Sequence, residues 1–229
     1  AHRMKRQIGA SAPLCKRIWQ SLVREKIENQ ARILDWKGED SKAGQLRSMA
    51  SRARSGDSDN LEAQAARMYW PALMGRGFSR DRFGEDANIY FNYCYTVLRS
   101  AVARSVVAVG LLPALGVHHR GRLNPFALVD DLMEPYRPLA DSLVLEVVEE
   151  AEEGADAELT PPVKRRLAGL LRLDLETDSG VSPLFEVLHA LAMSLVRSYQ
   201  EKKPCLKMGK MILPDRAAVG RLGRWVGDF

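Results

Sequence analysis

The stretch from residue 86 to residue 113 most constrains the fold of this chain. It is mostly apolar and ends at Gly110 and Pro113. A helix that is apolar on nearly every face is buried at the centre of a domain, so we predict a central helix here that other helices cover. Four polar residues interrupt it, and we expect them to face a polar cleft or hydrogen-bond partners: Asn88, Asn92, Arg99 and Arg104.

The other segments also show helical spacing. Residues 12–37 carry apolar side chains at helical intervals, beginning with Leu14 and Ile18, and Pro13 suits a first turn. No internal repeat and no Val, Ile or Thr alternation is evident, so we predict an all-α fold. Further helices are predicted at 40–54, 59–74, 125–153 with bends at Pro135 and Pro138, 161–173 and 182–202.

We expect residues 1–229 to form a single α-helical domain. The first helix at 12–37 precedes a short helix and polar loop at 38–58. The core of the candidate site covers 59–153, and C-terminal helices with a basic tail cover 154–229.

Charge is distributed unevenly along the chain. The net charge of +5 is modest, but residues 1–56 carry 13 Lys and Arg against 5 Asp and Glu. Residues 141–160 carry 8 acidic groups and no Lys or Arg. This separation predicts a basic side and an acidic side.

Cysteine use and hydropathy exclude several protein classes. Cys15, Cys94 and Cys205 are widely spaced and form no CxxC pair, so they indicate neither a zinc ribbon nor a disulfide framework. Reduced thiols in a cytoplasmic protein are the simplest interpretation. No apolar run approaches the roughly 18 residues of a membrane span, and no signal peptide is evident. Because the first residue is Ala1, we expect a chain cut from something longer or carrying a tag remnant.

Histidines and carboxylates gather between residues 116 and 135. His118 and His119 lie on a predicted loop, and the next helix places Asp131 and Glu134 on one face, with Asp130 turned away. Imidazole with carboxylates suits Mn²⁺ or Mg²⁺ better than structural zinc. Such an ion can bind a phosphate oxygen and activate a water or hydroxyl. Four arginines are candidates for holding flanking phosphates: Arg76, Arg80, Arg120 and Arg122.

The residues alone leave other interpretations open. A His-His pair before an acidic helix also occurs by chance. Asp59-x-x-Glu62 matches a capping box, which would explain Glu62 as a helix-start residue. The cations of the 12–37 helix suit either a solvated face or a phosphate backbone.

Several separated motifs resemble one known family. Residues 60–70 read Asn-Leu-Glu-Ala-Gln-Ala-Ala-Arg-Met-Tyr-Trp, and residues 110–119 read Gly-Leu-Leu-Pro-Ala-Leu-Gly-Val-His-His. Residues 124–138 read Asn-Pro-Phe-Ala-Leu-Val-Asp-Asp-Leu-Met-Glu-Pro-Tyr-Arg-Pro. In this order they resemble the CRISPR-associated integrases of spacer acquisition, the Cas1 family, and most of all its type II branch. The resemblance covers roughly residues 5–145.

The resemblance implies which residues bind the metal. In the family a glutamate, a histidine and an acidic residue do so, and the matching positions are Glu62, His119 and Glu134. His119 is preferred over His118 because the family histidine stands last in a Gly-x-x-His pattern. Asp131 matches a nearby family acid that supports a ligand or replaces one, and the role of His118 stays open.

The resemblance also implies a reaction and partners. The 3′-hydroxyl of a prespacer DNA attacks a phosphodiester at the leader–repeat junction of a CRISPR array, with Mg²⁺ or Mn²⁺ as cofactor. Implied partners are double-stranded DNA, a second copy of the chain, the small Cas2 subunit and, in type II systems, the effector nuclease, all in the cytoplasm of a prokaryote. The family has an N-terminal β-domain, which we expect to be missing here. A hypothesis from another class is a non-catalytic helical module that binds DNA or protein through its basic helix and tail.

Overall fold

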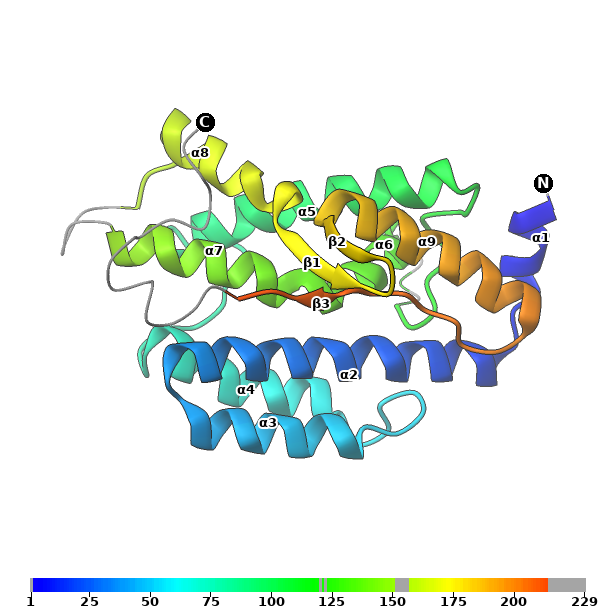
Figure 1. The fold of residues 1–229 in the computed structure, drawn as a ribbon, viewed down its shortest axis with the longest axis horizontal. Coiled ribbons are helices and arrows are strands. Elements are labelled where there is room, and N and C mark those ends of the chain that lie inside the picture. The colour runs from blue at the N-terminus through cyan, green and yellow to red at the C-terminus, as the bar shows by residue number, and fades with distance from the viewer. Residues whose placement is uncertain (1, 120, 122, 151–156, 214–229) are drawn as a thin grey trace.

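The computed structural model describes residues 2–119, 121, 123–150 and 157–213, and most of them are helical, as predicted (Figure 1). The elements are α1 (His2–Ile8), α2 (Ala12–Lys37), α3 (Asp40–Arg52), α4 (Leu61–Met74), α5 (Asn88–Ala108), α6 (Ala127–Met133), α7 (Arg137–Glu150), α8 (Pro161–Ala168) and α9 (Leu184–Glu201), the 3-10 turns η1 (Glu134–Tyr136) and η2 (Gly169–Arg172), and the strands β1 (Asp174–Thr177), β2 (Gly180–Pro183) and β3 (Lys210–Met211).

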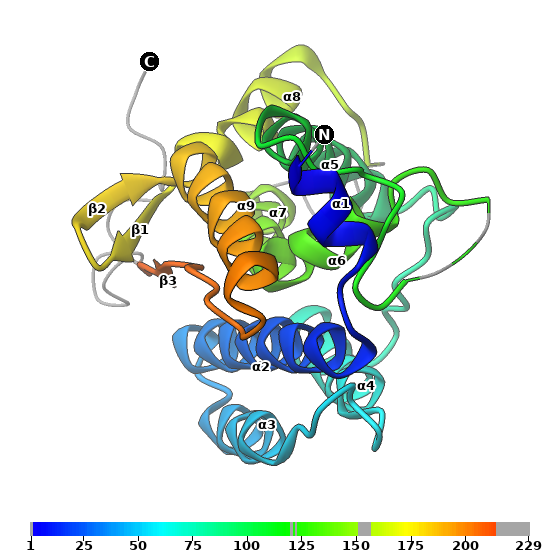
Figure 2. The same cartoon turned by 90° about the vertical axis from the view of Figure 1, so that its right-hand side faces the viewer.

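Helix α2 separates two layers of the molecule. Figures 1 and 2 show α3 and α4 on one side of it and α5, α6, α7 and α9 on the other. Its bounds are those predicted from apolar spacing, and Gly38 ends it in a left-handed conformation with φ 93°. Side chains on both sides of α2 are buried, including Leu22, Ile27 and Leu34. It therefore forms the backbone of one continuous apolar core.

The predicted central helix is α5. It packs against α6, α7, α8 and α9. Three of its four polar interruptions meet partners as expected: Arg99 contacts Asp130 through two hydrogen bonds of 2.6 and 3.0 Å, and Asn88 and Asn92 each accept a bond from Arg80. These contacts also place Asp130 away from the face that carries Asp131 and Glu134.

The predicted helix at 125–153 is broken where its prolines indicated a bend. It divides into α6, η1 and α7, and η1 begins at Glu134. Pro135 has no N–H and cannot continue the helical hydrogen-bond pattern. The buried amide of Asn29 donates to the Pro135 carbonyl at 2.7 Å, which fixes this break against α2.

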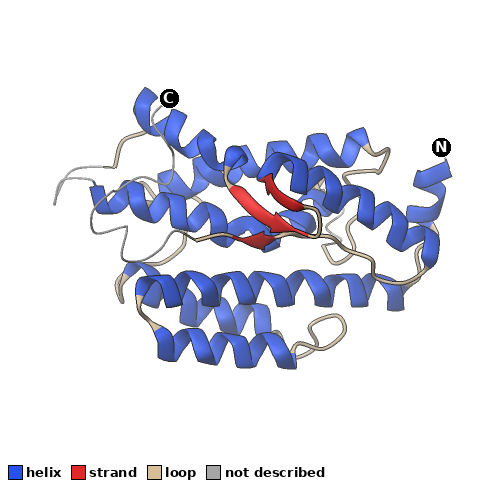
Figure 3. Cartoon of the chain, in the orientation of Figure 1, coloured by secondary structure: helices blue, strands red, loops and turns tan. Residues whose placement is uncertain are grey.

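The all-α prediction was wrong in one respect, because the chain also forms a small antiparallel sheet of order β2-β1-β3 (Figure 3). Its strands have four, four and two residues, too few to show an alternating pattern in the sequence. Leu175 is the buried residue of β1, and Gly180, with φ 113°, allows the tight turn between β1 and β2. Among the described helices, none has the length and hydropathy needed to cross a bilayer.

Candidate active site

Two of the three predicted metal ligands meet on one lysine. Lys26 Nζ lies 2.5 Å from Glu62 Oε1 and 2.5 Å from Glu134 Oε2. The residue lies on α2, whereas Glu62 is in the first turn of α4 and Glu134 begins η1. Burial acts to lower the pKa of Lys26, but the charges of Glu134 and Glu62 outweigh it and raise that pKa. The lysine is therefore a fixed positive charge between two carboxylates.

The sequence reasoning missed Lys26. Its partners are 36 and 108 residues away, so no local pattern marks it. A signal was nevertheless present: Lys26 stands seven residues after Trp19 and seven before Ile33, which puts it on a buried side of the helix. A lysine on the buried side of a helix rarely lacks a charged partner.

The capping-box interpretation of Glu62 is wrong. The cap of α4 comes from Asp57, whose carboxylate accepts the backbone N–H groups of Leu61 at 2.9 Å and Glu62 at 3.0 Å. Asp57 itself has a left-handed φ of 51°. Because Asp57 satisfies the helix start, the Glu62 side chain is free to point at Lys26.

Asp131 organises the histidine loop. It is completely buried, and its carboxylate accepts the N–H groups of Val117 at 2.6 Å, His118 at 3.0 Å and His119 at 3.1 Å. The same carboxylate lies 2.6 Å from Nδ1 of His119. A carboxylate only accepts, so Nδ1 carries the proton and the neutral ring presents Nε2 as a free acceptor. The hydrogen bond to Asp131 raises the pKa of His119 against the opposing effect of its partial burial.

Gly116 permits this loop to close on Asp131. A Cβ at this position would lie 2.3 Å from the His119 carbonyl and 2.7 Å from Asp131 Oδ2. The spacing Gly-x-x-His thus reflects a steric requirement. Gln7 of α1 holds the preceding residues, because its amide donates to the carbonyls of Leu112 and Leu115 at 3.0 Å each.

His118 faces a different partner from His119. Its ring stacks on buried Trp19 of α2, with centroids 4.1 Å apart and an interplanar angle of 4°. Trp19 also meets the edge of the His119 ring at 5.7 Å. His118 therefore anchors the loop to α2, while Asp131 holds His119 through Nδ1.

Arginines surround the carboxylates. Arg137 donates from Nε to Glu134 Oε1 at 2.8 Å. Burial acts to raise the pKa of Glu134, but Arg137 and Lys26 outweigh it and lower that pKa. Arg80 lines the same pocket, which has a volume of about 510 Å³ and includes Lys26, Glu62 and Glu134 in its wall.

The remaining predicted arginines are Arg76, Arg120 and Arg122. Arg76 is exposed in the loop after α4 and does not line the pocket. Arg120 and Arg122 lie outside the described residues. Arg80 is held by Asn88 and Asn92 at 2.8 and 2.6 Å.

A buried acid lies in the wall of the same pocket. Asp141 accepts hydrogen bonds from the hydroxyls of Tyr69 at 3.1 Å and Tyr95 at 2.5 Å. Burial raises the pKa of Asp141 to about 7, with the two tyrosine bonds opposing it. The sequence analysis did not single out this residue.

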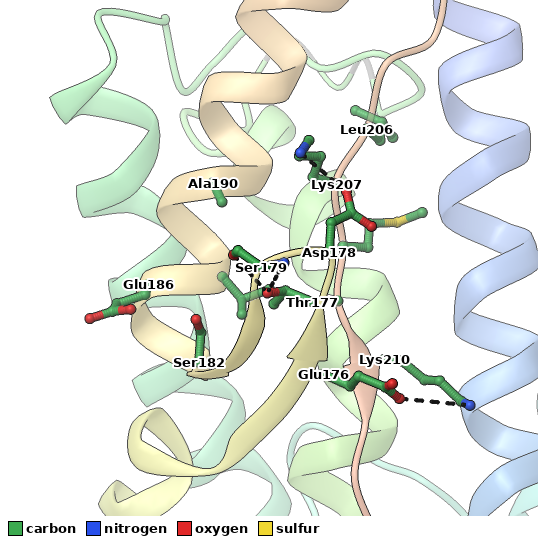
Figure 4. A pocket seen from close by; sticks show the side chains of 13 residues that line it. Glu176, Thr177, Asp178, Ser179, Ser182, Glu186, Ala190, Leu206, Lys207 and Lys210 are labelled. Atoms are coloured by element: carbon green, nitrogen blue, oxygen red, sulfur yellow. Dashed lines mark hydrogen bonds and ion pairs between the residues drawn. The ribbon is translucent and has the colours of Figure 1, made fainter.

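A second hollow contains none of the predicted site residues. It has a volume of about 670 Å³ and lies between the β1–β2 hairpin, α9 and residues 206–210 (Figure 4). Its charged side chains are Glu176, Asp178, Glu186, Lys207 and Lys210. It offers no imidazole and is remote in sequence from the motifs at 60–70 and 116–135.

Glu62 and Glu134 line the first pocket and His119 does not, but together these three side chains are of the kinds that bind a divalent cation. Two carboxylates and one imidazole nitrogen suit Mn²⁺ or Mg²⁺, and both Glu62 and Glu134 act on the pKa of His119, so the three groups interact electrostatically. Among the described residues, no three His, Cys, Asp or Glu side chains are grouped closely enough to coordinate an ion. Lys26 stands between the two carboxylates instead.

The family profile and the relatives that match this chain all belong to one family. The profile described as "CRISPR associated protein Cas1" matches residues 2–156. A CRISPR-associated endonuclease Cas1 of Neisseria meningitidis serogroup C (strain 8013) is 47% identical over 175 residues, which is 76% of this chain and 57% of that protein. A second such endonuclease, from Pyrobaculum aerophilum, is 31% identical over 156 residues, which is 67% of this chain and 52% of that protein. The chain thus spans about half the length of these curated relatives.

Solved structures show the same fold. A partial Cas6-RT-Cas1–Cas2 complex contains a chain with a TM-score of 0.74 at 18% identity, covering 92% of this chain and 73% of that one. A casposase bound to its integration product has a TM-score of 0.73 at 18% identity over 90% of this chain and 67% of that one. A Cas1 protein from Thermotoga maritima has a TM-score of 0.67 at 18% identity over 85% and 69%.

Proposed function

Because the chain belongs to the Cas1 family of CRISPR-associated proteins, we propose that it carries the catalytic centre of a DNA endonuclease and integrase of spacer acquisition, with Glu62, His119 and Glu134 as the ligands of a divalent metal. One observation carries the proposal. Glu62 and Glu134, from segments far apart in sequence, share the Lys26 ammonium, and both carboxylates act on the pKa of His119, whose ring Asp131 orients.

The proposed cofactor is Mg²⁺ or Mn²⁺. When bound, such an ion polarises a phosphoryl oxygen and stabilises the charge that develops during phosphoryl transfer. Glu62 and Glu134 would supply anionic oxygens, and His119 would supply Nε2. Asp131 would support this set from behind, since it holds Nδ1–H and fixes the ring.

Other residues of the chain have roles that follow from their positions. Arg137 neutralises part of the Glu134 charge and lies in the pocket wall, where its guanidinium suits a phosphate oxygen. Arg80 lines the same wall and is rigidly held, so it is the better phosphate candidate among the described members of the predicted arginine set. Trp19 and Gln7 keep the histidine loop in place.

The proposed reaction is attack by the 3′-hydroxyl of a prespacer on a phosphodiester at the leader–repeat junction of a CRISPR array. Relatives of this chain are named endonucleases, and a structural neighbour is a casposase bound to its integration product. Other neighbours belong to complexes that contain Cas2. By analogy we propose double-stranded DNA as substrate and Cas2 as partner. A second copy of the chain and, from the type II likeness, the effector nuclease are further proposed partners.

A manganese titration tests the metal site. We expect the 229-residue chain to bind Mn²⁺ in isothermal titration calorimetry, and His119→Ala to weaken that binding more than tenfold with an unchanged circular dichroism spectrum. His2→Ala is the matched control, because it removes an exposed histidine of α1 that is not a proposed ligand. Salt-dependent DNA binding with no specific Mn²⁺ binding would favour the non-catalytic binding module instead.

A further inference from the structure

We propose that Lys26 is a built-in counter-ion that occupies the cation position between Glu62 and Glu134 and that a divalent metal must displace. This inference rests on the proposed function, because it concerns the same carboxylates. It adds a step before catalysis: the ammonium leaves and the metal enters.

The contacts define the position of the ammonium. Lys26 Nζ makes two 2.5 Å contacts, one to each carboxylate, and the residue is only 8% exposed. A metal ion bound by the same two oxygens would lie within a few ångströms of this charge. Two cations at that distance repel strongly where water is scarce, so joint occupation is unfavourable.

The pocket has space for the Lys26 ammonium group when it leaves the two carboxylates. Lys26 lies in the wall of the 510 Å³ hollow together with Gln30 and Trp70. Its four-carbon stem is flexible and its charge is a compact point, so the head group can turn into the hollow while the stem stays packed. There it would face the space that a DNA phosphate enters.

Two consequences follow for the metal-free protein. Glu62 and Glu134 keep a partner, so the buried Glu134 does not lose its charge compensation without a metal. The lysine also competes with every entering cation, and it therefore lowers the apparent affinity for metal.

Lys26→Met tests the inference, since it removes the charge but keeps most of the stem. In the 229-residue chain we expect Mn²⁺ to bind at least tenfold more tightly by calorimetry. Lys42→Met is the matched control, because the Lys42 side chain is 43% exposed and pairs only loosely with Glu39 at 3.6 Å. It should leave the Mn²⁺ affinity unchanged.

Lysine acylation read by mass spectrometry gives a second measurement on the unaltered protein. We expect Lys26 to be protected without metal and labelled at least several-fold faster with saturating Mn²⁺, while Lys42 labelling stays constant. This measurement decides the matter even if Lys26→Met does not fold. Mn²⁺ binding by the unaltered chain with no gain in Lys26 labelling would overturn the inference and leave the proposed function intact. Failure of the unaltered chain to bind Mn²⁺ would remove the proposed function as well.

A separate observation carries a second inference: we infer that an arginine-lined groove between α2 and the end of α3 binds the phosphate backbone of duplex DNA. The groove has a volume of about 730 Å³, and Arg17, Arg24, Arg52 and Arg54 line it. Arg24 is pre-organised by donating to the Ala53 carbonyl from Nε at 3.1 Å and from a terminal nitrogen at 2.8 Å.

Three of the four groove arginines donate to backbone oxygens, and the fourth, Arg54, pairs loosely with a carboxylate. Arg17 donates to the Lys202 carbonyl and Arg52 to the Ser48 carbonyl. Arg54 lies 3.6 Å from Asp59. The contacts of Arg17, Arg24 and Arg52 with neutral carbonyls leave their positive charge little compensated, and a concave row of guanidinium groups complements phosphates.

The groove lies apart from the candidate active site. Residues of a helix are separated by about 100°, so Arg24 and Lys26 point roughly 160° apart around α2. The groove would thus hold a length of duplex away from the reacting phosphate.

Duplex binding measured by fluorescence anisotropy without metal tests this inference. We expect Arg17→Gln with Arg52→Gln to lower the slope of log affinity against log salt by about 2, as expected for two lost phosphate contacts. Lys164→Gln with Arg165→Gln on α8 is the control, because both residues are exposed and outside the groove. Equal slopes for the two double variants would overturn it.

Discussion

Asp131→Asn is the most informative single change, because one carboxylate holds the whole histidine loop. Oδ2 accepts the N–H groups of Val117 and His118, whereas Oδ1 accepts the N–H of His119 and faces its Nδ1. An asparagine that keeps its oxygen toward Val117 must turn its NH₂ toward His119. That NH₂ opposes a backbone N–H and can only donate to Nδ1.

The structure gives the size of the effect. Two of four charge-assisted bonds are lost at a site with no solvent exposure, and each is worth about 1.5–3 kcal/mol. We therefore expect a loss of about 3–6 kcal/mol in the free energy of unfolding. Donation to Nδ1 also moves the ring proton to Nε2, which removes the free nitrogen and should weaken Mn²⁺ binding about 10–100-fold.

Urea unfolding and Mn²⁺ calorimetry measure the two effects. Asp130→Asn is the matched control, because Asp130 is the neighbouring acid and pairs with Arg99 outside the histidine loop. It should lower stability by about 1 kcal/mol and leave the metal affinity unchanged. An Asp131→Asn protein that binds Mn²⁺ as tightly as the unaltered chain would refute the reasoning about the ring proton.

Four further outcomes are expected. Glu62→Gln should reduce Mn²⁺ affinity more than tenfold and abolish strand transfer with an unchanged circular dichroism spectrum; retained transfer would count against its ligand role. Gly116→Ala should destabilise the chain by about 2 kcal/mol or more in urea, because its Cβ meets backbone at 2.3 Å, whereas Gly44→Ala, with open space, should stabilise it by about 0.5–1 kcal/mol. Since the folded-state pKa of His119 is raised, its contribution to stability should be present below about pH 6.5 and fall as the pH rises through that pKa, and His119→Gln should flatten this part of the urea-derived stability profile. Asp141 has a pKa of about 7 in the folded state against 3.8 for a free aspartate. The metal-free chain should therefore lose stability as the pH rises from about 4 to about 7, and Asp141→Asn should remove that slope.

Helices were the predictable part of this fold. The bounds of α2 follow from apolar spacing and from Pro13 and Gly38, which act locally. The break at Glu134 was also predictable, because Pro135 lacks the N–H that an unbroken helix needs. Strands β1 to β3 were not, because pairs such as Leu175 with Met211 form only after distant segments meet.

The candidate site likewise has residues that could be predicted from the sequence and residues that could not. The family resemblance supplied Glu62, His119 and Glu134, and spacing supplied the separation of Asp130 from Asp131. Spacing alone paired Glu62 with Asp59 in a capping box. That pairing was wrong, because the residue that caps α4 is Asp57, which lies in an irregular turn. Lys26 was missed because its partners lie 36 and 108 residues away, and the one local signal, its spacing from buried Trp19 and Ile33, indicates burial but not which residues it contacts.

Long-range contacts that join α2 to the second half of the chain also bear on the order of folding. The bonds from Lys26 to Glu134 and from Asn29 to Pro135 close loops of 108 and 106 residues, and Gln7 closes one of 105 to Leu112. Closing loops of this length costs conformational entropy before the contact that closes them can stabilise the fold. Local helices should therefore form first, and the pocket should acquire its geometry in the last, rate-limiting stage of folding. A nascent chain that ends before residue 134 would have α2 and α4 in place but no assembled centre, so the proposed DNA-cutting activity would stay silent until synthesis has passed that residue.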